Sequence, residues 1–239
     1  MTPRPAPTQW QHAVVREVAH PAPRSVILRL EVPERGTHRP GQHYVVRLTA
    51  EDGYRASRSY SVASAPADPL VELFVERLDD GEVSVYLADG VQPGDDLEVR
   101  GPIGGWFAWD ADTPALGIGG GSGVVPLLAM LRHACDVGRG DLLRLVVAAR
   151  SAAALPYAGE LAGGGAVLAL SRTQRAGRPP GRLVAADLQG LVWPAATTPP
   201  PTYFVCGGAA FADHATRLLI DLGVGPGAIR VERFGPSGG

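Results

Sequence analysis

Short runs of alternating apolar and polar residues dominate the first half of the chain. Such runs, bounded by turn residues, predict half-buried strands. The predicted strands are Ser25–Glu31, His43–Leu48, Ser59–Ala63, Leu70–Val75 and Asp96–Arg100. Several short strands at this spacing favour an antiparallel barrel or sandwich. The pattern of Glu82–Ala88 fits either a strand or a helix.

From about Ala115 the pattern changes to apolar runs that alternate with helical periodicity. This alternation predicts parallel β–α–β units. The predicted strands are Ala115–Ile118, Leu142–Ala149, Ala166–Leu170, Tyr203–Cys206 and Ile229–Phe234. The predicted helices are Val124–Cys135, Leu155–Leu161, Leu183–Leu188 and Phe211–Leu222. Gly223 stands just past the last of these helices, where glycine ends helices most often. A domain boundary is expected near Asp110–Pro114.

Composition narrows the chemistry that the chain can carry. All 22 basic residues among the 239 are arginine, which excludes a Schiff-base lysine and a phosphate-binding P-loop. The two cysteines, Cys135 and Cys206, exclude a four-thiolate zinc or iron–sulfur site within this chain. The six histidines, His43 among them, show no metal-ligand spacing and are expected to be structural or exposed. No metal site is predicted.

The N-terminal segment Met1–Trp10 lacks the apolar stretch of a secretory signal, and no apolar run approaches about 18 residues. The formal net charge of −2 does not indicate a nucleic-acid partner, which would require a strongly basic face. We therefore expect a cytoplasmic protein with no membrane span and no nucleic-acid partner.

A glycine cluster, Gly117-Ile-Gly-Gly-Gly-Ser-Gly123, lies between a predicted strand and a predicted helix. Glycines there allow the backbone to approach a pyrophosphate, and the free N–H groups at a helix start attract anions. The spacing departs from the G-x-G-x-x-G pattern of dinucleotide-binding folds. Taken alone, the cluster fits a nucleotide site or a simple tight turn.

A second cluster is Arg58-Ser-Tyr-Ser61. On a strand, Arg58 and Tyr60 point to one face and Ser59 and Ser61 to the other. Arginine can pair with phosphate, tyrosine can stack on a flat ring, and serine can hydrogen-bond a ring edge. Taken alone, this cluster favours an ordinary surface strand.

Six motifs follow one another in a fixed order along the chain. They are Arg58-Ser-Tyr-Ser61, Gly81-Glu-Val-Ser84, Gly101-Pro-Ile-Gly104, Gly119-Gly-Gly-Ser-Gly123, Cys206-Gly207 and Glu232-Arg-Phe-Gly235. With this set, residues 10–239 resemble the ferredoxin–NADP reductase superfamily. The resemblance implies an N-terminal antiparallel six-stranded β-barrel that binds flavin, over residues 1–110. It also implies a C-terminal α/β parallel-sheet domain that binds NAD(P)H, over residues 111–239.

Position by position, the resemblance implies roles toward a flavin. Arg58 would pair with the flavin phosphate, Tyr60 would pack on the isoalloxazine, and Ser61 would lie near N5, where hydride arrives. The other implied flavin contacts are Ser59, the adenine-side residues Phe74, Val75 and Glu76, the pyrophosphate loop Gly81, Val83 and Ser84, and the aromatic Phe234. Glu76 stands where the family usually has a basic residue.

The resemblance also implies a nucleotide site. Its pyrophosphate turn would be Gly120, Gly121, Ser122 and Gly123, with Pro126 behind it. Cys206, Gly207 and Glu232 would flank the nicotinamide, and Ser61, Cys206 and Glu232 would be the catalytic residues. A 2′-phosphate site would consist of Arg150, Ser171, Arg172 and Arg175. Because arginine binds phosphate bidentately, this last group favours NADPH over NADH.

The resulting hypothesis is an NAD(P)H-dependent flavin oxidoreductase that uses FAD in preference to FMN. Because two cysteines cannot hold an iron–sulfur cluster, electrons would leave to a separate acceptor protein: a ferredoxin, a flavodoxin, or an oxygenase or other redox-enzyme component. Two alternatives stay open. The chain could be a free-flavin reductase, or a non-catalytic nucleotide-binding subunit of an electron-transfer complex.

Overall fold

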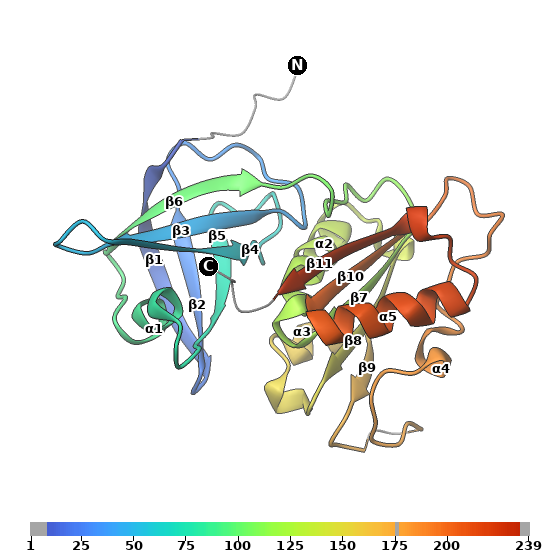
Figure 1. Cartoon of the computed structure of the whole chain (residues 1–239). Helices are drawn as coiled ribbons and strands as arrows, with labels where there is room; N and C mark the ends of the chain where they lie inside the picture. The colour runs from blue at the N-terminus through green and yellow to red at the C-terminus, as the bar shows by residue number, and fades with distance from the viewer. Residues whose placement is uncertain (1–8, 175–176, 235–239) are drawn as a thin grey trace. The chain divides into compact units, whose positions relative to one another are not determined.

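The computed structural model describes residues 9–174 and 177–234. The chain forms two compact units, the first ending at Ala108 and the second starting at Trp109. Each unit is built on one β-sheet, as Figure 1 shows. The sequence had placed the division between residues 110 and 111.

The first unit is a six-stranded antiparallel sheet. Its strands are β1 (Gln11–Ala22), β2 (Ser25–Glu31), β3 (His43–Thr49), β4 (Arg55–Ser61), β5 (Val71–Glu76) and β6 (Asp96–Ile103). They lie in the order β4-β3-β6-β1-β2-β5. The two outer strands meet through an antiparallel bridge between Val62 and Leu73, and the Ala63 N–H donates to the Glu72 carbonyl at 2.8 Å. These bonds close the sheet into the predicted barrel.

The period-two alternation that predicted the strands also builds the barrel core. In β2, Val26, Leu28 and Leu30 are fully buried, while Ile27 and Arg29 between them are less buried. Tyr44 of β3 and the other buried residues of the sheet join the same cluster. Full burial of a side chain of leucine size stabilises the folded state by about 1.5–3 kcal/mol. A shift of one residue would turn these side chains to solvent, so the inward residues of each strand fix its register.

Two elements differ from what the sequence pattern indicated. Strand β1 was not predicted, because its pairing with β2 shifts register twice, between Val15 and Glu17 and between Ala19 and Ala22. Such bulges break the alternation that reveals a strand. The ambiguous segment after β5 is the helix α1 (Glu82–Asp89), which turns Val83 and Leu87 into the core and ends at Gly90.

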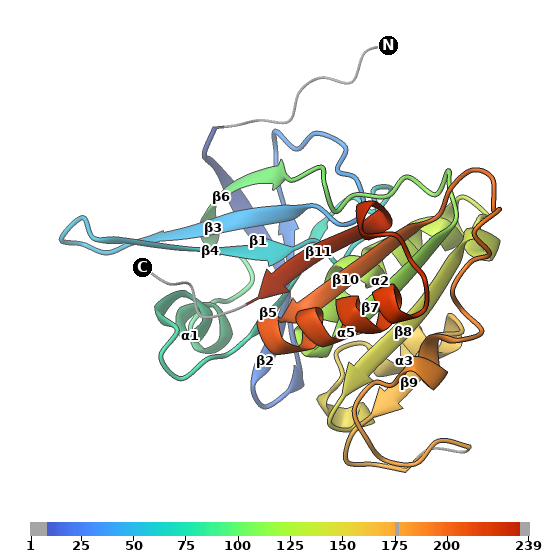
Figure 2. The ribbon, with the colours of Figure 1, turned by 45° about the vertical axis from the view of Figure 1, so that its right-hand side comes forward.

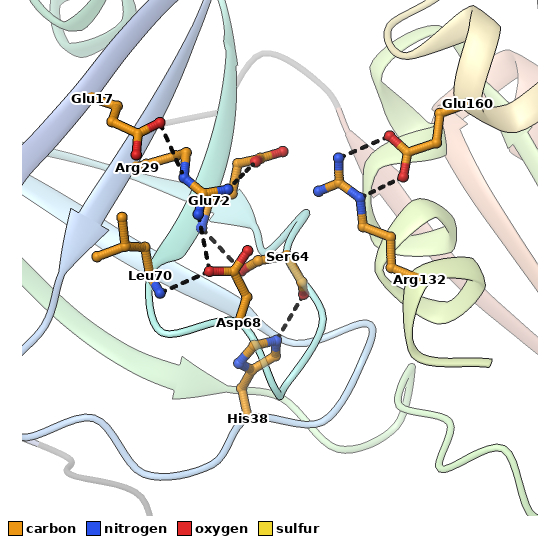
Figure 3. A network of polar contacts seen from close by, with 9 residues as sticks. All are labelled: Glu17, Arg29, His38, Ser64, Asp68, Leu70, Glu72, Arg132 and Glu160. Atoms are coloured by element: carbon orange, nitrogen blue, oxygen red, sulfur yellow. Dashed lines mark hydrogen bonds and ion pairs between the residues drawn. The ribbon is translucent and has the colours of Figure 1, made fainter. Parts of the chain in front are cut away.

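A network of charged and polar side chains joins β2 and β5 to the loop that follows β4 (Figure 3). The Arg29 guanidinium donates to Asp68 at 3.0 Å and to Glu72 at 3.2 Å, and lies 3.4 Å from Glu17. The Ser64 hydroxyl accepts from the Glu72 N–H at 3.0 Å. The Glu72 side chain is only 6% exposed, so Arg29 supplies the positive charge that its burial requires.

The second unit contains a five-stranded parallel sheet. Its strands are β7 (Ala115–Gly120), β8 (Leu143–Ala149), β9 (Val167–Leu170), β10 (Thr202–Gly208) and β11 (Ile229–Phe234). They lie in the order β11-β10-β7-β8-β9. All four pairings are parallel. This confirms the predicted parallel α/β sheet.

Helices cover both faces of this sheet. They are α2 (Val125–Asp136), α3 (Ala158–Gly163), α4 (Ala185–Leu188) and α5 (Ala209–Asp221). Helix α5 lies across one face, while α2 and α3 lie on the other (Figures 1 and 2). Helix α2 begins with Pro126 in its first turn, where a missing N–H costs nothing, and is buried over most of its length. Gly223 follows α5 at a φ of +87°, as expected for a helix end.

Within residues 9–174 and 177–234, no helix combines the length and the apolar character that a bilayer span requires. In the same part of the chain, no three His, Cys, Asp or Glu side chains converge as metal ligands.

Candidate functional site

The Arg58–Ser61 cluster lies on β4, at one side of the barrel sheet. Tyr60 lies opposite Tyr44 and Arg58 opposite Val46, so both belong to the face that points inward. Tyr60 packs at the border of the core, while Arg58 is exposed. Burial raises the pKa of the Tyr60 phenol, although the nearby Arg58 charge acts to lower it. Tyr60 is therefore a neutral, partly covered ring beside a cation.

On the other face of β4, Ser61 is almost completely buried and lies opposite His43 of β3. His43 is half-buried next to Gly104, which has a φ of +100°. Burial lowers the pKa of the His43 imidazole. Directly opposed residues in an antiparallel pair bring their Cβ atoms within about 4.5–5.5 Å. A neutral imidazole thus lies beside the serine that was predicted to approach the flavin ring.

The start of α1 forms a tight turn. Gly81 precedes the helix, and no side chain caps the first N–H groups there. The Ser84 hydroxyl donates to the Gly81 carbonyl at 3.0 Å and accepts from the Leu78 N–H at 3.1 Å. Ser84 therefore shapes the turn with its hydroxyl, and Val83 packs into the core. The remaining free N–H groups at this helix start suit an anion.

The strand before this turn carries the other predicted flavin contacts of the first unit. Val75 of β5 is fully buried, Phe74 is 8% exposed, and Glu76 at the strand end is exposed. Glu82 in the first turn of α1 accepts a hydrogen bond from the exposed Tyr54 at 3.1 Å. This bond raises the pKa of the Tyr54 phenol.

In the second unit, the strand order reverses between β7 and β10. After β7 the chain continues to β8 and β9 on one side, whereas β10 and β11 lie on the other. In parallel α/β sheets, ligands bind outside the carboxyl ends of the strands at such a switch point. Two predicted motifs meet there, because Gly119 of β7 lies beside Cys206 of β10.

Three glycines where β7 and β10 end have no room for a side chain. A Cβ at Gly123 would lie 2.3 Å from the Cys206 backbone oxygen. A Cβ at Gly120 would lie 2.6 Å from the Phe211 ring, and one at Gly207 would lie 2.7 Å from the same ring. The turn then enters a short 3₁₀ helix that no side chain caps. Its backbone N–H groups are thus left for a ligand, as an anion site requires.

Cys206 and Glu232 lie side by side on β10 and β11. Burial raises the pKa of Glu232 to about 7, so near neutral pH its carboxyl group exists in both protonation states. Burial raises the pKa of the Cys206 thiol well above its usual value, and the Glu232 charge adds to this effect. Cys206 is therefore a neutral thiol rather than a thiolate nucleophile. Phe234 ends β11, opposite Gly208.

The predicted phosphate group gathers at the ends of β8 and β9. The Ser171 N–H donates to the Ala149 carbonyl and the Arg172 N–H to the Arg150 carbonyl, each at 2.9 Å. Arg150 and Arg172 are both exposed, so two guanidinium groups stand on adjacent strand ends. Arg175 lies outside the described residues.

Comparisons with known proteins agree with this arrangement. Residues 14–107 match the family described as "Oxidoreductase FAD-binding domain". The ferredoxin reductase component of 3-ketosteroid-9-alpha-monooxygenase from Rhodococcus rhodochrous is 30% identical over 235 residues, which cover 93% of this chain and 63% of that protein. The ferredoxin–NAD(P)(+) reductase component of naphthalene 1,2-dioxygenase/salicylate 5-hydroxylase systems from Ralstonia sp is 29% identical over 226 residues, which cover 88% of this chain and 65% of that protein. The chain is thus similar to an oxidoreductase FAD-binding domain over residues 14–107, and to two reductase components over most of its length.

The fold of the chain is also found in solved structures. The crystal structure of a ferredoxin NADP+ reductase from Neisseria gonorrhoeae with bound FAD and NADP matches with a TM-score of 0.79. It is 20% identical and is covered over 98% of its length, with 94% of this chain aligned. The chain spans less than two thirds of the length of the two sequence relatives.

Three residues that border the predicted sites were not predicted from the sequence. His43 lies opposite Ser61, Phe211 packs against two glycines of the nucleotide turn, and Arg178 lies in the segment after β9. His43 had been read as structural or exposed. The one signal in the sequence was the spacing of Phe211, five residues after Cys206, at the start of a predicted helix.

Proposed function

We propose that this chain is an NAD(P)H-dependent FAD oxidoreductase that passes electrons to a separate acceptor protein. The observation that carries the proposal is the pair Cys206 and Glu232 beside the glycine turn, at the switch point of the parallel sheet. The names of the two sequence relatives, both reductase components, support it. In this proposal residues 1–110 form the flavin domain and residues 111–239 the nucleotide domain.

The first unit would hold FAD with groups that suit it. Arg58 would pair with phosphate, because its guanidinium is exposed and makes no ion pair among the described residues. Tyr60 would pack on the isoalloxazine, with Ser59 and Ser61 on the opposite face of the strand. The uncapped start of α1 at Gly81, Val83 and Ser84 would bind the pyrophosphate. Phe74, Val75 and Glu76 would line the adenine side.

The second unit would bind the nicotinamide nucleotide. The backbone of Gly120, Gly121, Ser122 and Gly123 would hold the pyrophosphate through N–H groups. The neutral Cys206 thiol would pack against the nicotinamide ring rather than attack it. Glu232, with a pKa of about 7, would accept or release a proton near the ring. Gly207 and Phe234 would complete this side of the site.

When bound, FAD supplies the chemistry that side chains lack, because it accepts a hydride and returns electrons one at a time. The chain's own groups then act mainly by alignment. Ser61 would hydrogen-bond the ring edge near N5. The relatives named as reductase components of oxygenase systems favour an oxygenase component or a ferredoxin as the acceptor.

NADPH is the proposed electron donor. The exposed Arg150 and Arg172 lie on neighbouring strand ends, with Ser171 between β9 and Arg172, and can together bind a 2′-phosphate. Arg175 belongs to the same proposed group. Substitution of Arg172 by Ala should therefore lower the ratio of kcat/KM for NADPH to that for NADH.

Anaerobic rapid mixing tests the function directly. The purified chain should be yellow, NADPH should bleach its flavin absorption band in a single turnover, and ferricyanide should restore it. Ser61→Ala and Cys206→Ala should slow the bleaching while FAD stays bound. A colourless protein that reduces added flavin would support the free-flavin reductase alternative. A bound flavin that NADPH does not bleach would support the non-catalytic subunit.

A further inference from the structure

Arg178 lies at the centre of an unusually dense set of hydrogen bonds after β9. Its Nε and Nη2 atoms donate to the two carboxylate oxygens of Asp187 at 2.6 and 2.8 Å. Its Nη groups also donate to four backbone carbonyls, those of Leu170, Pro179, Gly181 and Arg182, at 2.9–3.4 Å. The two side chains are only 17% and 7% exposed. The guanidinium thus holds a loop of the backbone around itself.

Asp187 connects this loop to the core of the second unit. Its carboxylate accepts from the Val184 N–H at 2.9 Å and so caps α4. Leu183 and Leu188 on either side are buried in the core, and the His214 ring of α5 bonds the Leu183 carbonyl at 2.8 Å. Burial alone would raise the pKa of Asp187, but the bonds from Arg178 and Val184 lower it overall. The carboxylate therefore stays charged and paired.

The other end of the Arg178 network reaches the proposed phosphate site. Leu170, whose carbonyl accepts from Arg178, is the last residue of β9 and directly precedes Ser171 and Arg172. The Gly181 N–H donates to the same carbonyl at 3.2 Å. Because Asp187 neutralises Arg178, that guanidinium is not a phosphate ligand. Its contacts instead fix the backbone from which Arg172 projects.

We infer that Arg178 and Asp187 are positioning residues for nucleotide selectivity. The pair holds the end of β9 so that Ser171 and Arg172 meet the 2′-phosphate of NADPH. This inference rests on the proposed NADPH preference of the same site. It adds two partly buried residues that touch no nucleotide to the determinants of that preference.

Calorimetric titration of the full FAD-loaded chain tests the inference. The two probes are adenosine 2′,5′-bisphosphate, which carries the 2′-phosphate, and ADP, which lacks it. Arg178→Lys keeps the charge but loses the planar fork, and Asp187→Asn removes the partner charge. Each should weaken bisphosphate binding about tenfold, since small displacements of a binding group have large effects. Each should change ADP binding less than about twofold.

Arg182→Lys is the matched control, because Arg182 is an exposed arginine of the same segment that offers Arg178 only its carbonyl. It should change neither affinity. Equal weakening of both probes in Arg178→Lys, or no change in either, would overturn the inference.

The variant Arg172→Ala distinguishes failure of the positioning role from failure of the proposed 2′-phosphate site. If Arg172→Ala leaves bisphosphate binding unchanged, the proposed phosphate site fails and the inference fails with it. If Arg172→Ala weakens bisphosphate binding but Arg178→Lys and Asp187→Asn do not, only the positioning role fails. Selective weakening in all three variants supports both.

Discussion

The two units offer their candidate binding groups in different ways. In the barrel, side chains of one strand do so: Arg58 and Tyr60 project from β4 at the border of the core. In the parallel sheet, backbone groups do so, because a side chain at Gly120 would meet the Phe211 ring of α5 and one at Gly123 would meet the β10 backbone. Removing a side chain should therefore damage the first site, whereas adding one should damage the second.

The largest effect is expected from loss of the barrel's charged network. Arg29→Ala removes the guanidinium that pairs with the largely buried Glu72, so the free energy of unfolding of the first unit should fall by about 3–5 kcal/mol. Urea unfolding followed by tryptophan fluorescence measures it. The control is Arg16→Ala, whose ion pair with Glu31 is half exposed and should contribute less than about 1 kcal/mol. Equal losses in both variants would show that burial does not distinguish the two pairs.

A side chain added to the nucleotide turn should have the next largest effect. In Gly123→Ala the new Cβ would meet the Cys206 carbonyl oxygen at 2.3 Å, so the turn must move away from β10. NADP+ binding, measured by calorimetry, should weaken about 100-fold. Gly140→Ala places its Cβ in open space and should leave NADP+ affinity unchanged. Retained affinity in Gly123→Ala would contradict a backbone-built site.

Removal of a side chain from β4 gives the matching test of the barrel. Arg58→Ala should weaken FAD binding about 10–100-fold, because a charge-assisted bond to phosphate is lost. Arg55→Ala, at an exposed arginine on the same strand, should bind FAD as the wild type does. Dialysis followed by the flavin absorbance that stays with the protein measures both. Equal retention of FAD by both variants would remove Arg58 from the site.

The smallest effect concerns Glu232 and pH. Its pKa of about 7 in the folded chain exceeds the ordinary value of 4.5, so the folded state binds the proton more tightly. The free energy of unfolding should therefore fall as pH rises from about 4.5 to 7. At about 1.4 kcal/mol per pKa unit the full difference corresponds to roughly 3 kcal/mol, which solvent screening at the partly exposed Glu232 reduces to about 1–2 kcal/mol. Urea unfolding at pH 5 and pH 8 should show this difference in the wild type and lose it in Glu232→Gln. An identical pH dependence in the two proteins would contradict it.

Regular strands and helices were predictable from local pattern. Residue alternation predicted β2 with the observed bounds, because this strand buries every second residue from Val26 to Leu30. The bounds of β11 were also as predicted. Strand β1 escaped because its two bulges break that regularity. Helix α1 was ambiguous because Glu82–Ala88 mixes β-branched and helix-forming residues, and only burial of Val83 and Leu87 against the sheet decides its form.

The motifs of the candidate site were visible in the sequence, but its supporting residues were not. The glycine turn and Cys206 stand out as local signals, and the fold brings them together through the strand order. His43, Phe211 and Arg178 carry no such signal. Each acquires its place only when distant segments meet, as when Arg178 reaches Leu170 and Asp187 at once.

The closure of the barrel has a consequence for motion along β4. Just past Ser61 the chain is held from two sides, since Val62 donates to the Gln42 carbonyl and Ala63 to the Glu72 carbonyl. Toward Arg55 the strand pairs with β3 alone. Amide hydrogen exchange should therefore slow progressively from Arg55 to Ala63. Strand β4 is therefore expected to be rigid at the end proposed to contact the isoalloxazine ring. It is expected to be more mobile toward the end proposed to contact the flavin phosphate.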